Sequence, residues 1–359
     1  MGYILILLFV PMFYAKSWAQ EINKLPEFKL LGIDDNYHSN DDFNQYENLG
    51  IVFYSNHCRI SQKFDDLIKR MAKLFAEKNS LLIAVSPNYE KSILPDEKAY
   101  SEVGDSFQEM KIRARLKKFN FLYLYDGKDQ DLAKKVGVTA TPHAFIYNKE
   151  RRLIYNGRIG DFNNVNDLNA SDFFETFAHK SNEKDYFLQT KVFGSAIKTV
   201  EDLELAEEVR RRYSEEKIRV SHATRKKIDF FLTHPSEKPK LVYVWSIGDN
   251  ENRENLLAMS SIFKIFRKRG LKVYTICVGT NLPKTKEILE KAQLSTTNFL
   301  LEGRNFSPLA RYHPNEGNRI TPFLALLDKE GKLIVSNYGL FDPLFYKIKI
   351  IEALKEPNI

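Results

Sequence analysis

The chain has 359 residues, too many for one ordinary hydrophobic core and enough for two domains with connecting segments. Hydrophobic residues make up 43% and charged residues 28%, a composition typical of globular proteins. The net charge is +7, but lysines and arginines alternate with acidic residues in most segments. Because this charge forms no basic tail or stripe, we expect no nucleic-acid partner.

The first residues have the pattern of an export signal. Residues 2–13 are almost wholly apolar, a run shorter than the about 20 residues that span a bilayer as a helix. Lys16 interrupts the run, and Ser17 and Ala19 place small residues where a signal peptidase reads them. We therefore predict a signal peptide at 1–19 and a periplasmic or extracellular protein without a stable membrane span. An uncleaved anchor is the alternative.

After the signal, short apolar runs alternate with amphipathic stretches. Residues 50–54 and 81–85 are β-prone and apolar, which predicts buried strands. Between them, apolar residues fall at helical spacing over 58–78. The elements that we expect next are a helix, a short extended piece, a helix and a hairpin, at 106–118, 122–125, 129–135, and 144–147 with 152–155.

The second half repeats this order of elements. We expect strand, helix, strand, helix and hairpin at 240–245, 253–269, 271–277, 284–292, and 323–327 with 332–335. The repeat predicts an α/β protein built from two tandem copies of a central mixed β-sheet flanked by helices. The first domain is placed at 25–164, a largely helical connector at 165–238, and the second domain at 239–353. The clearest helix of the connector lies at 201–216.

Three short motifs in the first half resemble the redoxin branch of the thioredoxin superfamily. They are Phe53-Tyr54-Ser55-Asn56-His57-Cys58, Thr141-Pro142 and Gly194-Ser195-Ala196-Ile197-Lys198. One redoxin subgroup typically shows Cys-Asn-His-Cys-Pro, Cys-Thr-Pro and Gly-Cys-Ser-Ile-Lys at these places. The resemblance covers about residues 25–198 and implies a thioredoxin-like fold with peroxide or thiol–disulfide chemistry.

This sequence lacks the partner thiols of that subgroup. Ser55, Ala140 and Ser195 stand where the subgroup often has cysteine, and Arg59 stands where it has proline. Ser61 occupies the second cysteine position of the thioredoxin Cys-x-x-Cys motif. The resemblance therefore implies one redox thiol, Cys58, and no internal dithiol cycle.

The second half is similar to exported thioredoxin-like proteins at Val244-Trp245 and at Ile320-Thr321-Pro322-Phe323. When Val244 is counted as Phe53, Asp249 falls at the position of Cys58 and Asn252 at that of Ser61. We therefore expect the second copy to have no redox activity. The other cysteine, Cys277, lies in an apolar strand and is expected in the core.

Cys58 lies where a thiol is easily ionised. A thiol reacts as thiolate, and an ordinary cysteine has a pKa of about 8.5. The start of a helix stabilises the anion, and Arg59 and His57 add neighbouring positive charge. The alternative is a buried and inert cysteine.

Thr141-Pro142 resembles the cis-proline loop that faces the active cysteine in this fold. The resemblance implies that the backbone of Thr141 pairs with an extended substrate chain and that Thr321-Pro322 has the same shape. Ser55 has two interpretations. It either replaces a cysteine or aims its hydroxyl at a peroxide, as the threonine of the peroxiredoxin Pro-x-x-x-Thr-x-x-Cys motif does. Ile51 stands at that motif's proline position. The candidates for a peroxidatic arginine are Arg113, Arg115 and Arg158.

Three functional hypotheses follow. In the first, Cys58, assisted by Ser55, His57 and Arg59, attacks a peroxide or a disulfide, and an external thiol reductant completes the cycle. Thr141 and Pro142 bind the substrate, which includes protein disulfides, and we expect no metal and no cofactor. The second hypothesis is a non-catalytic binding or scaffold protein. The third is a disulfide between Cys58 and Cys277 that locks the two domains.

Overall fold

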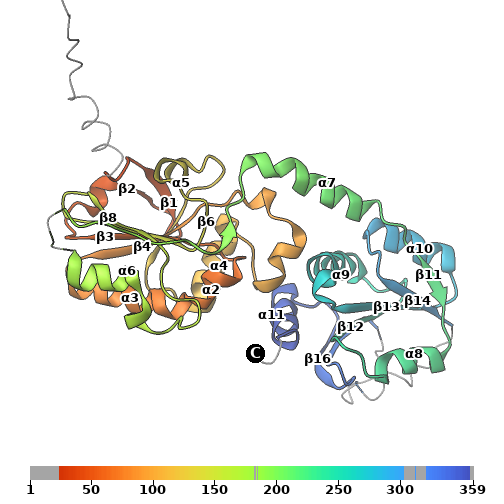
Figure 1. Ribbon diagram of the computed structural model, residues 1–359. Helices are drawn as coiled ribbons and strands as arrows, with labels where there is room; N and C mark the ends of the chain where they lie inside the picture. Colours follow the sequence, from red (N-terminus) through yellow and green to blue (C-terminus); the bar gives the residue numbers. More distant parts are fainter. Residues whose placement is uncertain (1–23, 182, 184, 303–311, 313–320, 356–359) are drawn as a thin grey trace, which may run out of the picture. The chain divides into compact units, whose positions relative to one another are not determined.

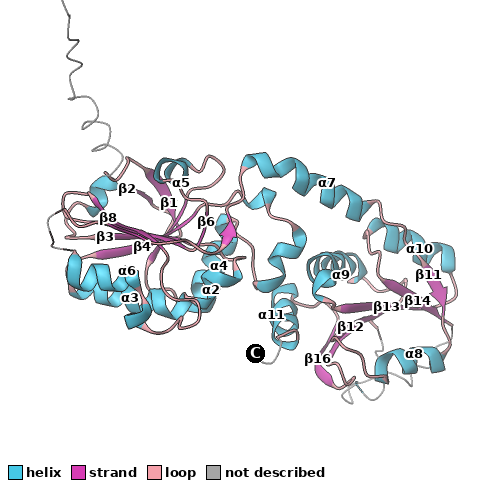
Figure 2. Cartoon of the chain, in the orientation of Figure 1, coloured by secondary structure: helices cyan, strands magenta, loops and turns pink. Residues whose placement is uncertain are grey.

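The computed structural model describes residues 24–181, 183, 185–302, 312 and 321–355. The predicted signal peptide lies outside these residues. The chain divides into two compact units, the first made of residues up to Tyr89 with Asp105–Lys198, the second of Glu90–Gly104 with residues from Thr199 on. In both units helices pack on a sheet (Figures 1 and 2). No helix in the described part of the chain is long and apolar enough to cross a bilayer.

The sheet of the first unit has eight strands, with β3 near its centre. β3, β4 and β5 are parallel, and β7 runs antiparallel to β3. This places the ends of the three parallel strands at one edge, where β3 leads into the helix that follows Cys58. In spatial order the strands are β2 (Tyr37–Ser39), β1 (Lys29–Gly32), β5 (Leu122–Tyr125), β4 (Leu81–Ser86), β3 (Leu49–Phe53), β7 (His143–Tyr147), β8 (Leu153–Gly157) and β9 (Leu188–Gln189).

The helices of the first unit begin and end at local signals. The helix expected over 58–78 is present but breaks at Phe64 (φ −94°, ψ 5°) into α2 (Arg59–Lys63) and α3 (Asp65–Glu77). Ser106 caps α4 (Phe107–Lys117) by accepting from the N–H of Glu109. Gly137, at φ +76°, ends α5 (Asp131–Val136) in a conformation that glycine adopts without strain. A short helix, α6 (Asp172–Glu175), lies between β8 and β9 in the chain.

Alternate residues of β3 face two separate cores. Val52 and Tyr54 pack with the apolar face of α3, and Ile51 and Phe53 pack on the opposite side of the sheet. Both faces are therefore covered, which explains why the strand is apolar throughout rather than alternating.

The second unit repeats the central five strands in the same order. β12, β13 and β14 are parallel, β15 is antiparallel to β12, and β16 is antiparallel to β15. The spatial order is β11 (Val220–His222), β14 (Thr297–Leu301), β13 (Lys272–Val278), β12 (Lys240–Trp245), β15 (Phe323–Leu327) and β16 (Leu333–Tyr338). The predicted internal repeat is confirmed, although the sequence analysis did not identify β14.

The repeat extends to the register of the strands. Phe53 pairs with His143 and Val244 pairs with Phe323, and in both units the partner directly follows a proline with a cis peptide bond. Both hairpins also carry a register shift at the same place, between Ile146 and Tyr147 and between Leu326 and Leu327. Counting Val244 as the equivalent of Phe53 is therefore correct.

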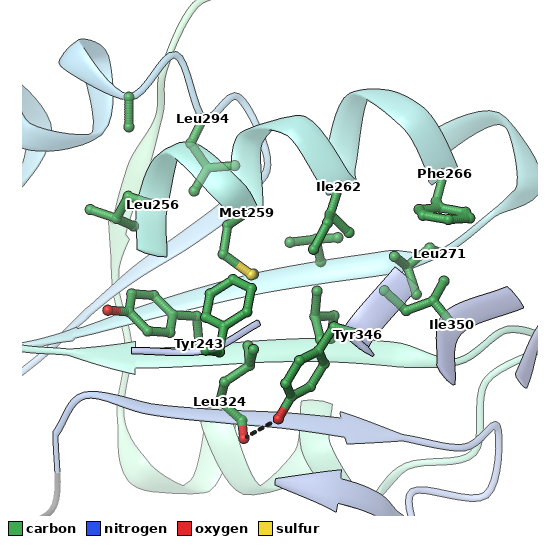
Figure 3. Close-up of a cluster of buried hydrophobic side chains, with 14 of the residues drawn as sticks. Tyr243, Leu256, Met259, Ile262, Phe266, Leu271, Leu294, Leu324, Tyr346 and Ile350 are labelled. Carbon is green, nitrogen blue, oxygen red and sulfur yellow. Dashed lines mark hydrogen bonds between the residues drawn. The ribbon is translucent and has the colours of Figure 1, made fainter. Parts of the chain in front are cut away.

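Helices cover both faces of the second sheet. Figure 3 shows Met259 and Ile262 of α9 above Tyr243 and Leu324 of the sheet, with Tyr346 of α11 beside them. The hydroxyl of Tyr346 donates to the carbonyl of Leu324 at 3.4 Å. The other face packs against α8. The helices of this unit are α7 (Leu203–Ser214), α8 (Arg225–Thr233), α9 (Asn252–Phe266), α10 (Leu282–Lys291) and α11 (Pro343–Ala353).

Residues 90–104 are a loop of the first half by sequence but pack in the second unit. Ala99 is buried in the core beneath α9, and Arg269 donates to its carbonyl at 2.6 Å. Lys268 forms an ion pair with Asp96 at 2.8 Å. The chain thus passes between the units three times, after Tyr89, Gly104 and Lys198. Residues 165–238, predicted as a connector, are shared between the units.

Candidate functional site

Cys58 lies at the junction of β3 and α2, where it is the N-cap residue of the helix. Its sulfur accepts from the backbone N–H of Ser61 at 3.4 Å and donates to the carbonyl oxygen of Thr141 at 3.0 Å. The side chain is fully buried. The thiol therefore meets the loop of the cis proline, Pro142, although 83 residues separate it from Thr141 in the chain.

Hydrogen bonds lower the pKa of Cys58. Burial raises the pKa of this thiol, but hydrogen bonds from Ser195 and Ser61 favour the anion and outweigh burial, so that the pKa lies below the ordinary value. The sequence predicts this shift from the start of the helix, with added charge from Arg59 and His57. Arg59 is exposed at the first position of α2, and the leading favourable contributions come from the two serines instead.

Ser55 supports the proline loop. Its hydroxyl lies 2.9 Å from that of Thr141, and both residues are fully buried. Thr141 thus binds Ser55 with its side chain and Cys58 with its carbonyl. The Thr141-Pro142 peptide bond is cis, as the resemblance implies.

The edge of the proline loop is occupied by a strand of the same chain. β10 (Ser195–Ala196) pairs antiparallel with β6 (Ala140–Thr141), with Ser195 opposite Thr141. Ser195, which the sequence indicates only as a replaced cysteine, thereby lies beside the Cys58 site, and its polar groups favour the thiolate. No local sequence pattern points to this contact, because β6 and β10 are far apart in the chain.

His57 is held by a carboxylate that the sequence analysis did not identify. Its Nδ1 lies 2.6 Å from Oδ2 of Asp105, and its backbone N–H donates to Oδ1 at 3.1 Å. Asn88 donates to the same carboxylate at 2.9 Å. Burial raises the pKa of Asp105, but the charge of His57 and these hydrogen bonds outweigh it and hold the pKa below its usual range.

The candidate arginines for peroxide chemistry have partners other than Cys58. Arg113 is buried and lies 2.7 Å from the carboxylate of Asp65, and Arg158 lies 2.6 Å from that of Asp172. Arg115 is exposed and donates to the carbonyl of Lys111. These contacts give the peroxidatic interpretation no support.

In the second unit a carboxylate takes the place of the thiol. Asp249 accepts from the N–H and the hydroxyl of Ser246, at 2.7 and 3.0 Å, and from the hydroxyl of Thr321 at 3.0 Å. The Thr321-Pro322 peptide bond is cis. Helix α9 begins at Asn252, three residues after Asp249.

The other cysteine of the chain is a core residue. Cys277 is buried, accepts from the hydroxyl of Thr285 at 3.3 Å, and has a pKa that burial raises to about 11. Both cysteines are free thiols, so the disulfide between Cys58 and Cys277 is not present in this structure. Within the described residues, no group of three or more histidine, cysteine and acidic side chains is arranged to hold a metal ion.

The chain is similar in structure to several solved proteins. No protein-family model matches the chain, and no curated protein matches it. A hypothetical protein from Sinorhizobium meliloti is 24% identical, with a TM-score of 0.43 over 50% of this chain and 93% of that chain. An uncharacterized conserved protein from Geobacillus kaustophilus is 21% identical, with a TM-score of 0.39 over 49% and 89%.

A thiol:disulfide interchange protein of the thioredoxin family from Chlorobium tepidum is 17% identical, with a TM-score of 0.29 over 33% of this chain and 81% of that chain. The fold itself follows from the topology of this chain. Each unit has three parallel strands, an antiparallel hairpin beside the first of them, and a cis proline directly before that hairpin. The chain therefore carries the thioredoxin-like fold twice.

Proposed function

We propose that this protein is an exported thiol–disulfide oxidoreductase in which Cys58 is the nucleophile. One observation carries the proposal. The thiol of Cys58 lies against the carbonyl of Thr141, and the hydrogen bonds that its sulfur accepts lower its pKa although it is fully buried. Thiols whose pKa is lowered near a helix start are the ones that attack disulfides. Membership of the redoxin branch and export remain predictions from the sequence.

The single thiol fixes the order of the reaction. The thiolate of Cys58 attacks one sulfur of a substrate disulfide, forms a mixed disulfide with it, and releases the other substrate sulfur as a thiolate. An external thiol then attacks the sulfur of Cys58 or of the substrate and breaks the mixed disulfide. A second equivalent of external thiol is needed for complete reduction, so that two external thiols are oxidised for each substrate disulfide reduced.

A disulfide substrate fits the site better than a peroxide. The hydroxyl of Ser55 is bound to Thr141, and Arg113 and Arg158 are bound to carboxylates. A peroxide would need these groups around the thiol to polarise the O–O bond. A disulfide needs only the thiolate and a place for the substrate chain, for which we propose the backbone of Thr141, now paired with β10.

The test is turnover of a small disulfide with glutathione as the reductant. We expect activity from the whole chain, none above background from Cys58→Ser, and nearly unchanged activity from Cys277→Ala. Equal rates for the whole chain and Cys58→Ser would contradict the proposal.

The second candidate is a non-catalytic binding protein. The complete burial of Cys58 and the carboxylate in place of the thiol at Asp249 favour it. Its signature is a Cys58 thiol that reacts with iodoacetamide only near the ordinary thiol pKa of about 8.5 and supports no turnover.

A further inference from the structure

We propose that residues 193–198 are an internal ligand of the Cys58 site, which takes the place of a substrate strand and must detach before Cys58 reacts with another protein. This inference rests on the proposed function but makes a separate claim, namely that the resting protein is closed by its own chain. The segment contains β10 and lies at the end of the first unit.

The first argument is the pairing of the strands. β6 pairs with one strand, β10, and within this pair Ser195 lies opposite Thr141 in antiparallel register. An extended substrate chain that used the same backbone groups would compete directly with β10. Because Ser195 lies opposite Thr141, whose carbonyl oxygen is 3.0 Å from the sulfur of Cys58, β10 lies beside the thiol as well as along the edge.

The second argument is the close approach of Gly194 to the proline loop. A Cβ atom at this position would lie 1.8 Å from the carbonyl oxygen of Thr141 and 2.5 Å from its carbonyl carbon. Only glycine permits β10 to lie this close to Thr141. The same geometry predicts the class of occupant that β10 imitates, an extended protein segment in which glycine precedes the cysteine that meets Cys58.

The third argument is that little holds the segment over the thiol. Its C-terminal end is fixed, because the N–H of Lys198 donates to Asn88 at 2.8 Å and its carbonyl accepts from Gln130 at 2.8 Å. By contrast, Gly194 is exposed and the side chain of Phe193 is 51% exposed. Ser195 and Ala196 pair with β6, and the N–H of Ile197 donates to the carbonyl of Thr139 at 3.2 Å, so a short ladder separates the closed from the open state.

The decisive variant is Gly194→Ala. The added methyl group clashes with the carbonyl of Thr141, so we expect β10 to detach. In the whole chain, alkylation of Cys58 by iodoacetamide, followed by peptide mass mapping, should become at least about tenfold faster, a change that corresponds to ~1.4 kcal/mol in the opening equilibrium. Gly248→Ala is the matched control, because nothing lies within 4 Å of a Cβ atom there.

The rates are measured over a range of pH so that the two claims separate. A faster Gly194→Ala reaction supports the internal ligand at any apparent pKa, because release of β10 also removes Ser195 from the thiol. An ordinary thiol pKa in the unchanged chain, where Ser195 is in place, overturns the oxidoreductase. Equal rates for Gly194→Ala and the unchanged chain overturn the internal ligand, whatever the pKa is.

A second variant covers the case in which Gly194→Ala does not fold. In Ser195→Cys, the new sulfur should lie beside Cys58, and oxidised glutathione should join the two thiols in a disulfide while it is reduced to two molecules of glutathione. We expect both cysteines to become unreactive to iodoacetamide until a reductant is added. Failure of this disulfide to form would show that β10 does not lie over Cys58.

Discussion

The two proline loops of this chain have the same framework and differ in the group that meets it. In the first unit Ser55 bonds Thr141 and the thiol of Cys58 meets the loop. In the second unit the hydroxyls of Ser246 and Thr321 lie 3.4 Å apart, and a carboxylate, that of Asp249, meets the loop. The comparison separates what the fold needs from what the chemistry needs.

The shared serine–threonine pair belongs to the fold. Ser246 and Thr321 occupy the positions of Ser55 and Thr141 in a unit that has no thiol at this place. A hydroxyl that is kept where no cysteine remains supports the cis-proline loop rather than a reaction. We therefore infer a structural role for Ser55, and this hydroxyl gives the peroxide interpretation no support.

The largest expected effect on stability concerns the buried pair of His57 and Asp105 in the first unit. Asp105→Asn removes the charge that faces the buried His57 and should lower the stability of the first unit by about 3–5 kcal/mol. Hydrogen exchange of β3 should accelerate and that of β12 should not. The control is Asp172→Asn, whose ion pair with Arg158 is about one third exposed and should contribute less than ~1 kcal/mol. Equal effects of the two variants would contradict the role of Asp105.

The same carboxylate makes the first unit sensitive to acid. The folded state lowers the pKa of Asp105. Its contribution to the free energy of unfolding is therefore complete above the ordinary aspartate pKa of about 3.9, and is lost as the pH falls through the lower folded value. Urea unfolding between pH 6 and acid pH should show a larger loss of stability for the unchanged chain than for Asp105→Asn. Parallel pH curves would argue against the shift.

A smaller effect tests the shared framework. Ser55→Ala leaves the fully buried hydroxyl of Thr141 without this partner and should cost about 1–3 kcal/mol. Ser246→Ala should cost less, below ~1 kcal/mol, because Thr321 is only half-buried and water can replace the lost bond. Hydrogen exchange of β7 and β15 reports the two units separately. A larger cost in the second unit would break the comparison.

The variant Asp249→Cys tests whether the fold alone lowers the pKa of a thiol at this position. Cys58 caps its helix, whereas α9 begins three residues after Asp249, so the new thiol should titrate near the ordinary pKa of about 8.5. The measurement is the pH dependence of alkylation in a Cys58→Ser, Cys277→Ala background. A pKa as low as that of Cys58 would mean that the proline loop, and not the helix cap, ionises the thiol.

The smallest expected effect concerns Ser195. Ser195→Ala removes a hydrogen bond that favours the thiolate, so the pKa of Cys58 should rise while the fold is kept. The pH profile of Cys58 alkylation measures this rise. Ala196→Ser, at a neighbouring exposed position, should leave the profile unchanged. A lower pKa in Ser195→Ala would contradict the assigned hydrogen bond.

The sequence predicted elements whose signal is local. β3, β4, β12 and β15 are apolar runs bounded by turns, and α9 has a clear apolar stripe. The elements predicted from the sequence end with the hairpin, although Asp342 and Pro343 mark the start of α11.

The contacts between distant segments were not predictable in this way. Asp105 reaches His57 across 48 residues, and Ser195 reaches Thr141 through a strand of only two residues. Such pairs follow from the folded topology and leave no period in the sequence. The resemblance marks Ser195 as a position where cysteine is common. It does not indicate that Ser195 belongs to a strand that lies beside Cys58.

The loop of residues 90–104 has a consequence for how the protein is made. Ile93 and Ala99 are 1% exposed, and the helix beneath which Ala99 is buried, α9, is synthesised more than a hundred residues later. During synthesis these apolar residues stay without α9 for on the order of ten seconds. A fragment that begins at Thr199 lacks these residues, so we expect the core of the second unit to be incomplete in it.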